Sequence, residues 1–202
     1  MYSKTLKSKI EVMFSEMGDK VSDIITNAPS FRMASDNIAT LVASETATRS
    51  KTMLSDLYSE MSKQVLDSLH DISKQNRFYE VNLRQEIFDK YNFEVPSNGI
   101  NFKEANRVYC SIAAGVGTMA VGSVFVFALS STGPAIPIAL VVAASIAAFC
   151  ASYFKAMPST NKSNFNTAVN KYLLEVKLEY IAWFDEVERY FNTRAEVIKL
   201  SI

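Results

Sequence analysis

The feature that most limits how this chain can fold is an uncharged stretch, residues 108–154, which contains no Asp, Glu, Lys, Arg or His. All 21 acidic and all 21 basic residues lie outside it. One helical crossing of a bilayer needs about 20 apolar residues, so the stretch is long enough for two. Helices in the core of soluble proteins rarely stay apolar on every face over such a length. We therefore predict a helical hairpin that inserts into lipid.

The two legs of this hairpin are expected at about residues 108–130 and 136–154, joined by a turn that contains Gly133, Pro134 and Pro137. Small residues recur at every fourth position of each leg, a spacing that lets two helix backbones approach closely in lipid. The predicted packing residues are Ala114, Gly115, Thr118 and Gly122 in leg one, and Ala143, Ala147 and Ala151 in leg two.

Basic residues flank the uncharged stretch on both sides: Lys103 and Arg107 precede it, and Lys155 and Lys162 follow it. The tip between the legs carries no charge. By the positive-inside rule both termini are expected in the cytoplasm. Two alternatives stay open. The tip can stop in the far interface as a re-entrant wedge, or a soluble form can hide the hairpin and insert it on a trigger.

The charged remainder of the chain shows helical periodicity, so we predict an all-α fold with three regions. Residues 1–107 form an N-terminal amphipathic region, residues 108–154 the membrane hairpin, and residues 155–202 a C-terminal amphipathic helix that packs on the N-terminal region. Apolar residues step by three and four, as in coiled coils and helix bundles. The predicted helix-interaction residues are Leu54, Leu57, Met61, Val65, Tyr172, Val176, Tyr180 and Trp183.

Local signals predict where these helices begin and end. The first is expected over residues 3–27, before Pro29. Residues 35–92 are expected either as one helix about 87 Å long or as two helices broken near residues 43–52, where there is little to bury. Ser35 or Asp36 is expected to cap the start of this segment. Ser159 or Asn161 is expected to cap the C-terminal helix.

No residue pattern indicates catalysis, a cofactor or a metal. His70 is the only histidine, and a catalytic triad or a zinc site needs more partners. Cys110 and Cys150 both lie in the uncharged stretch and are interpreted as small apolar residues. The formal net charge of +0 argues against nucleic acid as a partner. We expect no enzyme activity.

Amphipathic helices on both sides of an uncharged hairpin resemble α-helical pore-forming toxins and the pore domain of colicins. The final helix, around Trp183–Arg194, is also similar to the stalk helix of bacterial dynamin-like proteins, although the GTP-binding loop is absent. The resemblance implies a protein that inserts in the bilayer, associates with further copies, and forms a pore or remodels the membrane. The alternative is a membrane-anchored scaffold whose cytoplasmic helices bind a protein partner.

Overall fold

The computed structural model describes residues 2–91, 142, 145–146, 148–150, 153–154, 157 and 159–202, with the backbone alone at residues 2 and 3. Every secondary-structure element in this part of the chain is an α-helix, which confirms the all-α prediction for it. Three helices are long: α1 (Tyr2–Asn27), α2 (Phe31–Ser68) and α8 (Lys162–Ser201). Two are short: α3 (Ile72–Glu80) and α4 (Leu83–Lys90).

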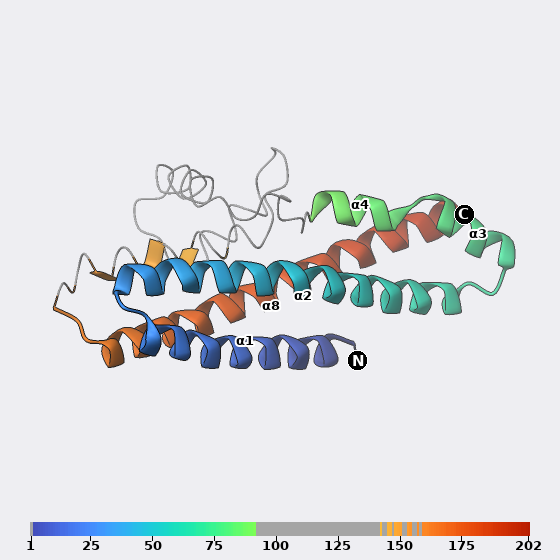
Figure 1. The fold of residues 1–202 in the computed structure, drawn as a ribbon. Helices are drawn as coiled ribbons and strands as arrows, with labels where there is room; N and C mark the ends of the chain where they lie inside the picture. The colour runs from blue at the N-terminus through green and yellow to red at the C-terminus, as the bar shows by residue number, and fades with distance from the viewer. Residues whose placement is uncertain are drawn as a thin grey trace.

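The long helices form a bundle in which α1 runs antiparallel to both α2 and α8, while α2 and α8 run in the same direction (Figure 1). Ion pairs record the antiparallel register of α1 and α2. Lys9 lies 3.0 Å from Asp56 near one end, and Lys20 pairs with Glu45 near the other. α1 is shorter than its two neighbours, so it covers only part of their length.

The core of the bundle is the apolar stripe of each helix. Helices with residues at heptad-like spacing on one face bury that face against their neighbours. The stripe of α1 contributes Ile10, Met13, Phe14, Met17, Val21 and Ile25, each at most 5% exposed. The matching stripe of α8 runs from Phe165 to Ile198, and its most deeply buried aromatic residues are Phe165, Tyr180, Phe184 and Phe191.

The predicted break near residues 43–52 is wrong, because α2 continues through this stretch. The side chains in this stretch are small, yet several of them are fully buried. Ala43, Thr46 and Ser50 are each 0% exposed. Tyr180 of α8 lies beside Ser50, and the hydroxyl groups of the two residues pair. Small side chains on one helix thus accommodate a large one on the next.

The prediction of one helix over residues 35–92 is also wrong, because the chain turns at Leu69–Asp71. Gln75 of α3 donates from its side-chain amide to the carbonyls of Leu66 and Leu69, which satisfies the end of α2. The Asp71 carboxylate accepts from the backbone N–H of Ser73 and caps α3. His70 is exposed in this turn.

The start of α2 also differs from the prediction. Its cap is Ser30, whose hydroxyl accepts from the Met33 N–H at 3.3 Å, rather than Ser35 or Asp36. The start of α8 agrees with one of the two predicted caps. The Asn161 side chain accepts from the Asn164 N–H at 2.8 Å. The prediction of a helix over residues 3–27 is confirmed by α1.

Most of the predicted hairpin lies outside the described residues. This holds for all its predicted packing residues, Ala114, Gly115, Thr118, Gly122, Ala143, Ala147 and Ala151, and for its predicted turn, Gly133, Pro134 and Pro137. Within the described part of the chain, no helix has both the length and the apolar character needed to cross a membrane.

Candidate functional site: the groove that holds the apolar segment

The uncharged stretch packs against the N-terminal parts of α2 and α8, and we call the surface of these two helices that it contacts the groove. The described residues of its second leg, here called the leg-two residues, are Val142, Ser145, Ile146, Ala148, Phe149, Cys150, Tyr153 and Phe154, and all have helical backbone. Val142, Ile146 and Cys150 are at most 1% exposed. Their spacing of four places them on one face of a helix. That face is buried in the core, where it joins the apolar stripes of the bundle.

Aromatic rings line the groove. Phe165, near the start of α8 and 0% exposed, contacts Phe31 at the start of α2 with ring centroids 5.5 Å apart. Two leg-two rings close over this pair. Phe154 lies 5.2 Å from Phe31 and 4.7 Å from Phe165, and Tyr153 lies 5.6 Å from Phe165. The segment is therefore held at this end by a four-ring cluster.

A second aromatic contact lies further along α8. The Phe149 ring stacks on the Tyr172 ring with centroids 4.3 Å apart and an interplanar angle of 18°. The Tyr172 hydroxyl donates to the Ser145 carbonyl at 3.1 Å. Burial raises the pKa of Tyr172 to about 12, so this hydroxyl keeps its proton and remains a donor at neutral pH. On the α2 side, the Cys150 thiol lies near the Ser35 side chain.

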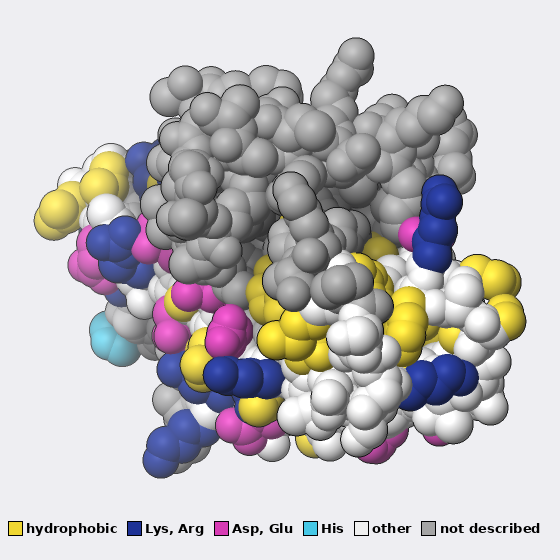
Figure 2. All heavy atoms as spheres, turned by 90° about the vertical axis from the view of Figure 1, so that its left-hand side faces the viewer, with side chains coloured by type: hydrophobic (Ala, Val, Ile, Leu, Met, Phe, Trp, Pro, Cys, Tyr) yellow, Lys and Arg dark blue, Asp and Glu magenta, His cyan; other side chains and the backbone are white. Residues whose placement is uncertain are grey.

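Apolar and aromatic contacts thus dominate the groove, and the leg-two residues bring no charge to it. The view along the bundle onto the end where α2 and α8 begin shows a group of apolar side chains with charged side chains of both signs around it (Figure 2). Met33 and Met157 are half exposed, at 50% and 54%. The basic residues of this region include Arg32 and Lys162. The Lys162 ammonium donates to the carbonyls of Thr26 and Ala28 at the end of α1.

The predicted helix-interaction residues are divided between the groove and the core. In α2, Leu54, Leu57, Met61 and Val65 are buried, and in α8 so are Val176, Tyr180 and Trp183. Tyr172 contacts the leg-two residues through its ring and its hydroxyl. Sequence reasoning did not single out Phe31 as a site residue. A large aromatic residue directly after a capping serine was the available signal.

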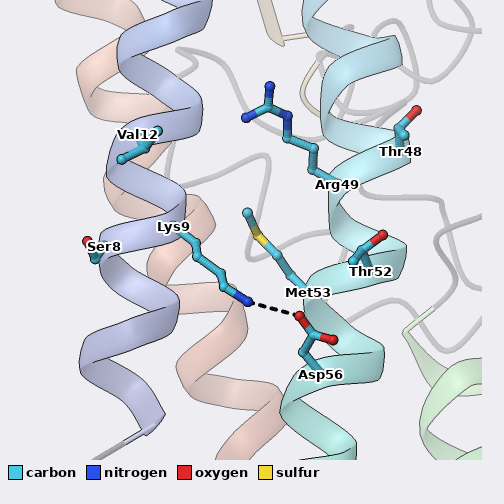
Figure 3. A pocket seen from close by; sticks show the side chains of 8 residues that line it. All are labelled: Ser8, Lys9, Val12, Thr48, Arg49, Thr52, Met53 and Asp56. Atoms are coloured by element: carbon cyan, nitrogen blue, oxygen red, sulfur yellow. Dashed lines mark hydrogen bonds and ion pairs between the residues drawn. The ribbon is translucent and has the colours of Figure 1, made fainter.

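A second concave feature lies between α1 and α2, a pocket of about 450 Å³ (Figure 3). Its charged residues are engaged in ion pairs across the two helices. Lys9 pairs with Asp56 at 3.0 Å, and Arg49 pairs with Glu16 at 2.6 Å. The pairing raises the pKa of the Arg49 guanidinium and keeps it charged. The pocket wall also contains the apolar residues Val12 and Met53.

Metal chemistry finds no support in the described part of the chain. No group of three or more His, Cys, Asp or Glu side chains there could hold a metal ion.

Comparison with known protein families, with curated proteins and with solved structures finds no match for this chain.

Proposed function

We propose that this protein acts on lipid bilayers: it inserts its uncharged segment from a state in which the bundle holds part of that segment docked, and inserted copies associate to open a pore or deform the membrane. The observation that carries the proposal is the burial of the leg-two residues Val142, Ile146 and Cys150 in the groove between α2 and α8. The groove shields one face of a segment that has no charged residue of its own.

The contacts in the groove suit a segment that can leave it. Apolar burial is non-directional, so hydrocarbon chains can replace ring and methyl contacts without loss of specific geometry. The groove also makes a polar contact with the segment, the bond from the Tyr172 hydroxyl to the Ser145 carbonyl, which insertion would break. The Ser145 carbonyl does not need this bond in lipid, because the backbone of a helix satisfies its own hydrogen bonds. Transfer from groove to bilayer therefore exchanges one apolar environment for another.

The charged helices are proposed to stay at the membrane surface. α1, α2 and α8 carry acidic and basic residues along their outer faces and pair many of them, as Lys9 does with Asp56 and Lys7 with Asp185. Moving such charges to the centre of a bilayer costs several kcal/mol each, about 2.5 kcal/mol or more on insertion scales. The uncharged stretch has no ion-pathway residue of its own, so a pore would need several copies.

The first experiment is membrane fractionation of the intact chain, followed by an alkaline wash and a dye-leakage assay on purified protein and sealed vesicles. We expect retention in the washed membranes and release of the dye. Retention with sealed vesicles would instead favour the membrane-anchored scaffold. Protein that stays out of the membrane fraction and does not bind vesicles under any condition tested, acidic pH and anionic lipid included, would refute insertion.

A further inference from the structure

α4 is the last element that the structure describes before the uncharged stretch, and it has little capacity to stand alone. Helices shorter than about 12 residues are marginal in water, and α4 has 8. Its N-cap residue, Asn82, has a positive φ of 50° and makes no side-chain capping bond. α4 is therefore stable only through its contacts with the rest of the molecule.

Those contacts are with the C-terminal half of α8 (Figure 1). The last α1 ion pair that the structure describes toward this end joins Lys7 to Asp185 at 3.2 Å. The contacts of α4 with α8 begin beside this pair, at Trp183, and continue past it to Arg194. Leu83 and Ile87 of α4 are 1% and 0% exposed, so one apolar face of this short helix is covered.

The second component of the contact is polar, and we call it the α4 clamp: Glu86, Lys90 and Tyr91 against Trp183, Tyr190 and Arg194. Arg194 donates to both carboxylate oxygens of Glu86, at 2.6 and 2.9 Å, and the Tyr190 hydroxyl donates to the same carboxylate. The Lys90 ammonium lies 3.6 Å from the centre of the Tyr190 ring. The Tyr91 ring meets Trp183 and Tyr190 edge-on, each 5.8 Å away.

The composition of the clamp differs from that of the leg-two groove. The groove is apolar, whereas Glu86 and Arg194 are about one-third exposed, at 31% and 35%, so water and ions reach them. The guanidinium and the Tyr190 hydroxyl hold the pKa of the Glu86 carboxyl below its usual value, with the Arg194 bonds as the larger cause. Partly exposed charge pairs of this kind are weakened by salt, unlike ring contacts.

The two attachments are also far apart on α8. The groove uses Phe165 and Tyr172, and the clamp uses Trp183 to Arg194. From Phe165 to Trp183 the helix rises about 27 Å at 1.5 Å per residue. While α4 is docked, the chain on the N-terminal side of the uncharged stretch is attached to α8 through residues 83–91, and the leg-two residues are attached to an earlier part of the same helix.

We propose that α4 is a releasable clamp: breaking the contact of Glu86 with Arg194 and Tyr190 undocks α4 as a unit, and this undocking precedes insertion of the uncharged segment. This inference rests on the proposed function. Undocking exposes the short helix to water, where it loses its helical structure, and releases residues 83–91 from α8. Insertion of the uncharged segment then no longer has to work against the contacts that hold α4 on α8.

The test compares E86Q and R194Q with E196Q. The Glu196–Lys199 pair lies within α8 at 3.0 Å and joins no second helix, so E196Q removes an ion pair without releasing an element. Amide hydrogen exchange in the absence of lipid reports undocking, and the rate of binding to vesicles of phosphatidylcholine and phosphatidylglycerol reports insertion. Far-UV circular dichroism and exchange in α1 report whether each variant keeps the bundle.

We expect E86Q and R194Q to speed amide exchange in α4 by about tenfold, in line with the loss of a charge-assisted hydrogen-bonded pair. Exchange in α1 should not change in these variants, and exchange in α4 should not change in E196Q. Vesicle binding is expected to be several-fold faster for the first two variants. Unchanged α4 exchange would overturn the clamp, and faster exchange with unaltered vesicle binding would overturn its role in insertion. Failure of every protein to bind vesicles, wild type included, would overturn the proposed function itself, which separates the two failures.

Discussion

The buried pair of Ser50 and Tyr180 yields the sharpest prediction about the bundle. Both residues are 0% exposed, and their hydroxyl groups pair across the interface of α2 and α8. Ser50 also donates to the Thr46 carbonyl one turn earlier in α2. The two hydroxyls are therefore not equivalent. Ser50 has a second partner inside its own helix, whereas the Tyr180 hydroxyl depends on Ser50.

The asymmetry determines the expected magnitudes. Y180F removes the hydroxyl, keeps the ring contacts with Phe14 and Phe184, and leaves Ser50 bonded to Thr46. Its cost is about 1 kcal/mol, the net value of one hydrogen bond. S50A leaves the Tyr180 hydroxyl buried without its partner and costs about 2 kcal/mol or more. The double variant strands no donor, so its cost is about 1 kcal/mol rather than the sum.

The assay is urea unfolding of the four proteins followed by far-UV circular dichroism, without lipid. In thermal unfolding, S50A is expected to lower the Tm by about 4–8 °C, and Y180F by about half as much. Thr46 Oγ1 is buried with no hydrogen-bond partner among the described residues, so it is a possible substitute acceptor. T46V combined with S50A removes it. Two results would refute the reasoning. The first is a loss of unfolding free energy in the double variant equal to the sum of the two single losses. The second is a loss for S50A, measured in the T46V background, that is no larger than the loss for Y180F.

Three further predictions concern the groove, the clamp and a helix cap. F165A removes the most central ring of the groove and is expected to cost about 3–5 kcal/mol in urea unfolding, whereas L178A, at a residue 63% exposed, changes stability by less than about 0.5 kcal/mol. The lowered pKa of Glu86 means that its contribution to stability is present above the ordinary carboxyl pKa of 4.5 and is lost as the pH falls through the lower pKa of the folded state. The stability difference between wild type and E86Q should therefore shrink in acid, and a constant difference from neutral pH down to strong acid would contradict this. N161A is expected to cost about 1 kcal/mol, measured in the same way, because it removes the cap of α8.

The helices themselves were largely predictable from local signals. α1 follows from a stripe of apolar residues that ends before Pro29, and the cap of α8 follows from Asn161. The prediction of a break at residues 43–52 was wrong because a sequence shows that small side chains bury little apolar surface, but not which large side chain of another helix packs against them. Ser50 lies beside Tyr180, 130 positions later in the chain, and their hydroxyl groups pair.

The turn at Leu69–Asp71 and the groove depend on tertiary contacts. Apolar residues continue through the turn at helical spacing, and the chain departs from the helix because Gln75 satisfies the last carbonyls of α2. The groove is formed by the first turns of α2 and α8, which are more than a hundred residues apart in sequence. Only the parallel arrangement of these two helices brings Phe31 to Phe165 and creates a surface for Phe154.

The central claim is that the uncharged segment must leave the groove to act on a bilayer, and a reversible crosslink tests it most directly. Ser35 of α2 lies near Cys150, so S35C introduces a second thiol beside it. C110S removes the remaining cysteine of the chain. Mass spectrometry of proteolytic fragments shows whether the disulfide has formed, and C110S alone, oxidised in the same way, is the control.

The measurement is dye release from sealed vesicles by the oxidised protein, before and after addition of a reductant. The account predicts that the crosslinked protein leaves the vesicles sealed and that reduction restores release to the level of the C110S control. Equal release by the crosslinked and reduced forms would show that the segment acts without leaving the groove, and would contradict the account.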